Sequence, residues 1–254
     1  MKKILPFLLL MNLFSCISQT KQNKTTKLEE KKSIVDYNLI IENKIFDGIE
    51  IETLEIGNLN LPSGRIVVCD PLVYSDSNPF LGTVNPGKYP IKIYVAKNKD
   101  SGDRYALAQL EFSKKKAEKW VLALLENENI EELKEDDSFF GFPVDSGLGS
   151  FFDYQTSLKY ERFLNEFYKK NPNKNIYDDF FASEFMKNAK DKSDPNDVGN
   201  WINYTFPDTE LNIAMFQSGY GDGLYPVYWG IDCNGEVTSL VIDFFVINLP
   251  EIKK

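Results

Sequence analysis

The chain has 254 residues, 43% of them hydrophobic and 14% aromatic, so it carries enough apolar side chains for one large globular domain or two small ones. Its formal net charge of −9 opposes binding to nucleic-acid phosphates and anionic lipid headgroups, so neither is expected as a general partner. The chain contains no histidine, which excludes Ser-His-Asp and Cys-His nucleophiles and removes the commonest zinc ligand. No motif indicates a cofactor or a metal.

The first sixteen residues are typical of a bacterial lipoprotein signal, with the sequence MKKILPFLLLMNLFSC. Lys2 and Lys3 give a positively charged start, and the apolar run after them is shorter than the roughly 20 residues that span a bilayer. The run ends at Ser15 and Cys16. We therefore predict a signal peptide over residues 1–15, cleavage before Cys16 and lipidation of Cys16. The alternative is an ordinary signal peptide with an incidental cysteine.

Residues 16–33 are predicted to be a flexible tether, because they are polar, lack aromatic residues and cannot bury enough apolar surface to order themselves. The rest, residues 34–254, is expected to form a single globular domain held at the bacterial cell envelope and facing the periplasm or the exterior. Two further cysteines, Cys69 and Cys233, lie in this domain. An exported compartment permits a disulfide between them, and two separate thiols are the alternative.

The first half of the domain reads as strands. Candidates are NLIIENKIF, IETLEIGNLNL and the buried run Arg65–Cys69, and a loop rich in Pro and Gly follows them. YPIKIYVAK and RYALAQLEF both alternate apolar and polar residues, and the turn-rich NKDSGD between them predicts an antiparallel hairpin. In RYALAQLEF the alternation places Ala106, Ala108, Leu110 and Phe112 on one face. The next run, SKKKAEKWVLALLENENIEEL, is compatible with either a helix or a buried strand.

The second half places helices before strands. Apolar residues recur at helical spacing in FFDYQTSLKYERFLNEFYKK, and NIYDDFFASEFMKNAK reads as a second helix. Four strands are then expected, in WINYTF, LNIAMF, LYPVYWGID and EVTSLVIDFFVI. In the third of these, Tyr225, Val227, Trp229 and Ile231 share a face. The fold class is therefore α+β, an antiparallel sheet or sandwich built from early and late strands with two or three helices between them.

Candidate functional carboxylates lie where apolar runs end beside glycine or proline. They are Asp70 in CDP, Asp145 and Asp153 in VDSGLGSFFD, and Asp222 in the GYGDG motif, where Gly221 and Gly223 flank it. If they converge, they could bind a divalent cation or serve as a catalytic acid and base. Each also has a purely structural interpretation. GYGDG would then be the turn of a hairpin between LNIAMF and LYPVYWGID, Asp153 a helix cap, and Asp70 the end of a strand.

Asp243 is a separate case, because it lies inside the apolar run SLVIDFFVI. If this carboxylate is buried it must be satisfied by donors, and Arg65 and Arg104 are the expected partners.

Five ordered blocks carry a resemblance to a known family: PSGRIVVCDPL, NPGKYPIKIYV, RYALAQLEF, FPVDSGLGSFFD and SGYGDGLYPVYWGIDCNGEV. Together they resemble an uncharacterised bacterial family of domains of unknown function with a GDG motif. The resemblance covers nearly all of the chain beyond about Leu54. It implies one shared domain with Asp70, Asp145, Asp153 and the Gly221–Gly223 motif on family positions, and it implies no activity, cofactor or substrate.

Three classes of function are compatible with the sequence. The first is a non-enzymatic binding or interaction lipoprotein of the cell envelope, anchored to the membrane at Cys16 and with a possible protein partner. One version is an immunity-type protein that neutralises a delivered toxin, for which an acidic surface suits a basic partner. The second is an aspartate-dependent hydrolase, with or without metal assistance. A structural envelope component is a third alternative. We expect the first.

The lipid anchor is testable at one residue. Replacing Cys16 with Ala should leave the precursor uncut, or release the protein from the membrane fraction, because the acyl chains on this cysteine are the predicted anchor. Labelling cells with a radioactive fatty acid, followed by membrane fractionation, measures both effects. Normal membrane retention of a cleaved Cys16→Ala protein would contradict the lipoprotein interpretation.

Overall fold

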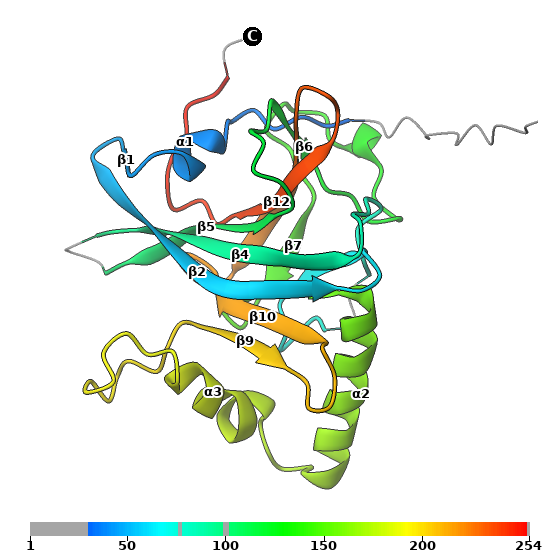
Figure 1. Cartoon of the computed structure of the whole chain (residues 1–254), viewed down its shortest axis with the longest axis vertical. Coiled ribbons are helices and arrows are strands. Elements are labelled where there is room, and N and C mark those ends of the chain that lie inside the picture. Colours follow the sequence, from blue (N-terminus) through cyan, green and yellow to red (C-terminus); the bar gives the residue numbers. More distant parts are fainter. Residues whose placement is uncertain (1–29, 76–77, 99–101, 253–254) are drawn as a thin grey trace, which may run out of the picture.

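Twelve strands in two antiparallel sheets form the centre of the protein in the computed structural model, which describes residues 30–75, 78–98 and 102–252 (Figure 1). The large sheet has the order β1-β2-β4-β5-β12-β11-β6, and β7 pairs with the other half of β11. Its strands are β1 (Ile45–Phe46), β2 (Ile49–Leu61), β4 (Gly87–Ala96), β5 (Arg104–Glu111), β6 (Lys119–Leu122), β7 (Gly141–Val144), β11 (Gly223–Ile231) and β12 (Val237–Asp243). The small sheet has the order β3-β8-β10-β9, with β3 (Ile66–Cys69), β8 (Leu148–Asp153), β9 (Trp201–Thr205) and β10 (Asn212–Gln217).

The main helices lie together beside the small sheet (Figure 1). They are α2 (Tyr154–Lys170) and a π-helical turn, η2 (Tyr177–Phe181), that continues into α3 (Ala182–Met186). Two shorter helical pieces are α1 (Asn38–Ile41) and the 3₁₀ turn η1 (Ile130–Glu132). The expected α+β class, with helices between early and late strands, is confirmed.

Three apolar clusters fill the spaces between these layers. The first lies between the two sheets and combines residues such as Ile93, Phe151 and Trp229. The second covers the outer face of the large sheet with the segment around Tyr37 and with the C-terminal residues Ile247 and Leu249. The third packs the helices on the small sheet and includes Tyr160, Phe181 and Phe185. Both faces of both sheets are thus covered, which is why many of the strands are almost continuously apolar.

The hairpin between YPIKIYVAK and RYALAQLEF is confirmed as the pair β4–β5. One detail of its expected faces is wrong. A register shift near Val95 pairs it with Tyr105 and the preceding Tyr94 with Leu107, so Ala106 lies with the second cluster instead of with Ala108. An extra residue in one strand turns the side chains around it to the other face, and alternation alone does not predict its position.

Two other runs differ from a simple strand or helix. Of the candidate strand NLIIENKIF, Asn38–Ile41 is the short helix α1, and only Ile45–Phe46 is a strand. The ambiguous run from Ser113 to Leu133 resolves into β6 and η1, so its apolar centre is a strand. The shared face of Tyr225, Val227, Trp229 and Ile231 is confirmed, because all four pack in the first cluster.

The prediction that GYGDG closes a hairpin between LNIAMF and LYPVYWGID is wrong. These two runs are β10 and β11, which belong to different sheets, so the motif carries the chain from the small sheet to the large one. The partner of β10 is β8, and the partner of β11 at this end is β7. Alternation marks both runs as strands but does not specify which strands they pair with.

The segment before the domain also has structure where it is described. The predicted tether includes residues 30–33, yet Lys32 pairs with Val121 and Ser33 donates its backbone N–H to Trp120 O at 2.9 Å. The earlier tether, the signal peptide and Cys16 lie outside the described residues, so lipidation stays a prediction. Within the described ranges, no helix combines the length and apolarity needed to cross a membrane. Cys69 is buried and Cys233 is exposed, and the two are not bridged.

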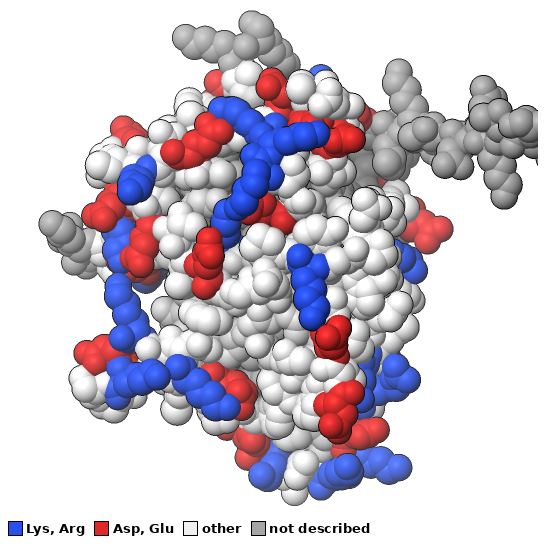
Figure 2. Space-filling view, in the orientation of Figure 1, with Lys and Arg blue, Asp and Glu red and all other residues white. Residues whose placement is uncertain are grey.

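Charged side chains of both signs are interspersed over the face drawn in Figure 2, and the described residues form several ion pairs. Lys115 lies 3.0 Å from Asp232 and 2.6 Å from Glu236, and Lys92 lies 3.0 Å from Glu111. This face therefore presents no extended patch of one sign.

Asp243 is buried at the end of β12 and is satisfied by donors, as expected, but the expected arginine partners are wrong. The Phe245 backbone N–H donates to Asp243 Oδ1 at 2.8 Å, and the Tyr37 hydroxyl is the second donor. The two arginines lie over aromatic rings instead, Arg65 over Tyr154 and Arg104 near Tyr220. Burial raises the pKa of Asp243 from 3.8 to about 6, against the opposing effect of these two donors.

This raised pKa predicts a loss of stability as the pH rises. The folded state binds a proton at Asp243 more tightly than the unfolded state does. The stabilisation that this proton gives the folded state is therefore fully present below pH 3.8 and is lost as the pH rises through about 6. The difference of about two pKa units corresponds to roughly 3 kcal/mol in the free energy of unfolding. Urea unfolding between pH 4 and 7.5 should show this slope in the wild type and a flatter one in Asp243→Asn. Equal slopes in the two proteins would contradict the assignment.

Candidate functional site

Two loops run side by side where the paired strands pass from one sheet to the other. The DSG loop, Asp145–Gly147, joins β7 to β8, and the GDG loop, Ser218–Asp222, joins β10 to β11. The Ser218 backbone N–H donates to Gly147 O at 3.0 Å, and a Cβ on Gly147 would lie 3.9 Å from the Cα of Gly221. Two motifs separated by about seventy residues of sequence therefore form one corner of the molecule.

Asp70 fastens the DSG loop. Its side chain is fully buried, and its carboxylate accepts five hydrogen bonds. Oδ1 accepts from the backbone N–H groups of Leu72 at 2.9 Å and Val73 at 3.2 Å, and from Ser146 Oγ at 2.6 Å. Oδ2 accepts from the backbone N–H groups of Asp145 at 2.9 Å and Ser146 at 2.7 Å. This buried carboxylate is saturated with donors, so its role in this geometry is to hold the DSG loop against the turn at Leu72 and Val73.

The GDG loop is held by its backbone and by Tyr225. Gly221 donates its N–H to Ser218 O at 2.7 Å, and Ser218 Oγ donates to Gly221 O at 2.8 Å. The Tyr225 hydroxyl donates to Gly221 O at 2.8 Å. Gly221 has φ +107°, which side chains rarely adopt, and a Cβ on Gly219 would lie 2.8 Å from Phe244 Cβ. Glycine is needed here for conformation and for close packing.

Asp222, by contrast, is exposed, and its carboxylate makes no hydrogen bond or ion pair within the described ranges. Asp145 is also exposed and accepts the Tyr74 hydroxyl at 2.6 Å, a bond that raises the pKa of Tyr74. Asp153 is fully buried and caps α2, as the helix-cap interpretation predicts: it accepts from the Gln155 backbone N–H at 2.7 Å and from Ser63 Oγ at 2.8 Å.

The four aspartates therefore have different surroundings. Asp70 and Asp145 meet through the Asp145 backbone, Asp153 lies at the far end of β8, and Asp222 extends into solvent. Over the ranges that the structure describes, no three His, Cys, Asp or Glu side chains are placed to hold a metal ion. The corner is formed by the backbone and glycines of the DSG and GDG loops. Asp70 supports it through hydrogen bonds, whereas the other three carboxylates lie at its surface or away from it.

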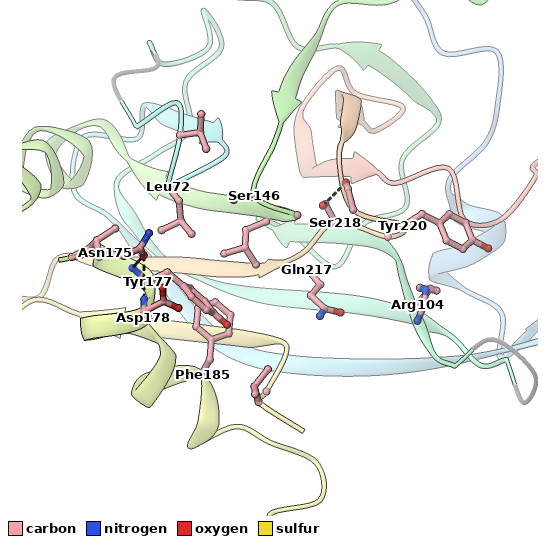
Figure 3. Close-up of a pocket in the computed structure, with 18 of the residues that line it drawn as sticks. Leu72, Arg104, Ser146, Asn175, Tyr177, Asp178, Phe185, Gln217, Ser218 and Tyr220 are labelled. Atoms are coloured by element: carbon pink, nitrogen blue, oxygen red, sulfur yellow. Dashed lines mark hydrogen bonds between the residues drawn. The ribbon is translucent and has the colours of Figure 1, made fainter. Parts of the chain in front are cut away.

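A cleft of about 690 Å³ opens beside this corner (Figure 3). One wall comes from the DSG and GDG loops and from Leu72 and Val73 after Asp70. The other comes from the helical layer, with Asn175, Tyr177 and Phe185. Volumes of this size are typical of sites for small molecules and short peptides.

Polar side chains from separate elements line the cleft. Figure 3 shows Gln217, the last residue of β10, between the rings of Tyr177 and Phe185 on one side and Arg104 on the other. Sequence reasoning missed Gln217 entirely and assigned Arg104 to a different partner. The composition does give one indication of Arg104. The chain has only three arginines against 26 lysines, so each arginine is a candidate for a specific role.

Comparison with known proteins identifies the domain without assigning an activity. Residues 59–242 match the family described as "Protein of unknown function (DUF4241)". The chain belongs to the DUF4241 family. The matched range contains Asp70, both loops of the corner and most of the cleft. The search of curated proteins and the search of solved structures returned no match. The resemblance to a family of unknown function is confirmed, whereas the GDG motif as its mark and the lipoprotein signal stay predictions.

The structure of the corner predicts that two Asp→Asn substitutions differ in their effect on stability. Asp70→Asn replaces an acceptor of five bonds with an amide whose NH₂ group faces donors, so we expect a loss of roughly 3 kcal/mol or more in the free energy of unfolding. Asp222→Asn should leave the free energy of unfolding unchanged, because its exposed carboxylate has no described partner. Urea unfolding of both variants measures this. Equal destabilisation by the two changes would contradict the division of roles.

Proposed function

We propose that this DUF4241 protein is a lipid-anchored envelope protein that binds a ligand in the cleft beside the DSG and GDG loops. The observation that carries the proposal is the use of Asp70. The Asp70 carboxylate accepts its hydrogen bonds from loops that line the cleft, and it holds these loops in position. A buried carboxylate whose two oxygens already accept five hydrogen bonds positions the loops around it, which is a structural role.

The remaining candidates give the alternative, an aspartate-dependent hydrolase, little support. An acid–base pair needs two carboxylates in one site whose surroundings separate their pKa values. Asp153 is occupied as a helix cap, and Asp145 and Asp222 are both exposed. Burial raises the pKa of the Asp243 carboxyl to about 6, but Asp243 is not among the residues that line the cleft.

The envelope location rests on the sequence. The charged start, the short apolar run and Ser15-Cys16 support export and lipidation. A non-enzymatic module with a tether is consistent with a cleft that is open to solvent on the surface of the domain.

Site-specific cross-linking in intact cells tests the binding role. A photoreactive phenylalanine analogue at Gln217, which is exposed within the cleft, should capture the ligand on irradiation. The matched control is the same analogue at Thr53, an exposed position of β2 outside the cleft. Mass spectrometry of the purified protein detects the adduct. Capture at position 53 as strong as at 217, or at neither position, would count against the cleft as the binding site.

The same assay separates binding from catalysis. The double variant Asp145→Asn, Asp222→Asn should still form the adduct at position 217 and should keep the cellular role, because neither carboxylate supports the cleft walls by more than the Tyr74 contact. A variant that still captures ligand but has lost that role would favour the hydrolase.

A further inference from the structure

Two charged side chains of opposite sign lie toward opposite ends of the cleft (Figure 3). Arg104 is at the end near the GDG loop. Its guanidinium donates to the Asp103 backbone O at 3.0 Å and lies 5.9 Å from the centre of the Tyr220 ring. Within the described ranges no carboxylate pairs with the Arg104 guanidinium. The adjacent Asp103 carboxylate is bound by Lys97 and by Lys190, the latter at 3.3 Å.

Asp178 is at the other end, in the first turn of η2. It is exposed, and in the part of the chain that the structure describes no cation pairs with its carboxylate. The adjacent Asp179 takes the available partners instead: Lys174 lies 3.3 Å from it, and the Asn175 backbone N–H donates to it at 2.8 Å. At both ends, therefore, the adjacent aspartate, Asp103 or Asp179, forms the ion pairs. Arg104 and Asp178, which line the cleft, have no ion-pair partner among the described residues.

Amide and aromatic side chains line the cleft together with these charges, and Gln217 lies between Arg104 and Asp178 (Figure 3). Gln217 and Asn175 each present a side-chain amide, which can both donate and accept, as a peptide bond requires of its partner. Asn175 Oδ1 is already engaged by the backbone N–H of Tyr177 at 2.8 Å, so its NH₂ group is the free half. The rings of Tyr177 and Phe185 supply apolar contact beside Gln217 (Figure 3).

We propose that the cleft binds a short peptide with free termini, with its C-terminal carboxylate at Arg104 and its N-terminal ammonium at Asp178. This inference rests on the proposed binding function and names the ligand class. The guanidinium fork matches a carboxylate in two hydrogen bonds, and the exposed carboxylate of Asp178 attracts an ammonium. The main chain of the peptide passes Gln217, and the volume of about 690 Å³ accommodates a few residues.

The probe is a mixture of tetrapeptides of random sequence with free termini, incubated with the full-length protein in detergent. Peptides retained after ultrafiltration are identified by mass spectrometry. The best retained sequence is then synthesised with both termini free, with an acetylated N-terminus, with an amidated C-terminus and with both termini blocked. Isothermal titration gives the Kd of each form.

In the wild type, blocking either terminus should raise Kd by about tenfold. Arg104→Gln should lose the preference for a free C-terminus and keep that for a free N-terminus, and Asp178→Asn should do the reverse. The matched controls Arg162→Gln and Asp137→Asn, both exposed and outside the cleft, should keep both preferences. A structural role for Arg104 or Asp178 would weaken all four peptide forms equally, so the loss of one preference alone identifies a direct contact.

The outcomes separate this inference from the function on which it rests. Peptides that bind equally well with blocked termini overturn the assignment of Arg104 and Asp178. Retention of no peptide, with cross-linking at Gln217 intact, overturns the peptide as ligand and leaves the binding function standing. If neither peptides nor the cross-linker report an occupant, both the inference and the proposed function are wrong.

Discussion

The bonds to the Asp70 carboxylate are the constraint on which the corner of the molecule depends. Asp70 follows the last residue of β3, yet three of its five donors lie in the DSG loop, so one side chain joins the small sheet to the strand pair that crosses between the sheets. Burying a carboxylate costs several kcal/mol unless donors surround it. Five donors meet that condition. The Tyr160 hydroxyl, which donates to Pro71 O at 2.9 Å, ties the same turn to α2 and so to the helical wall of the cleft.

Much of the fold could be predicted from the sequence, because alternation and helical spacing report burial along one element at a time. β2, the β4–β5 hairpin, α2 and its cap at Asp153 all follow from local patterns. Pairing between distant strands does not follow from such patterns, and for this reason the hairpin prediction for GYGDG is wrong. The cleft could not be predicted either, because Gln217, Arg104 and Asn175 come from three distant parts of the chain and none of them belongs to a motif. A saturated structural carboxylate such as Asp70 and a catalytic one also look the same in sequence, since both follow a strand and precede a loop.

A shifted pKa often marks a functional site. Asp243 shows that the position of the shifted residue in the fold must be known before a function is inferred from it. Its neighbours are Tyr37, from the segment before β1, and Tyr228 of β11, whose pKa burial and Asp243 raise to about 12. The Tyr37 ring also packs edge-on against Trp120, with 5.3 Å between ring centres, and Trp120 Nε1 donates to Asp36 Oδ1 at 3.0 Å. The buried carboxylate thus helps to fasten the start of the domain to the outer face of the large sheet, a role unrelated to the cleft.

The position of that fastened segment bears on how the cleft is presented. The segment around Tyr37 packs in the cluster on the outer face of the large sheet, whereas Phe185 and Ile176, which line the cleft, pack in the cluster on the helical side of the small sheet. In Figure 1, α1 and α3 accordingly lie on opposite sides of the two sheets. The described chain begins along the edge of β6, where Lys32 pairs with Val121, and reaches the outer face of the large sheet at Tyr37 and α1. The start of the domain is thus fastened to the large sheet, whereas the helical wall of the cleft packs on the small sheet, so the two attachments are independent and the contacts of Tyr37 leave that wall unobstructed.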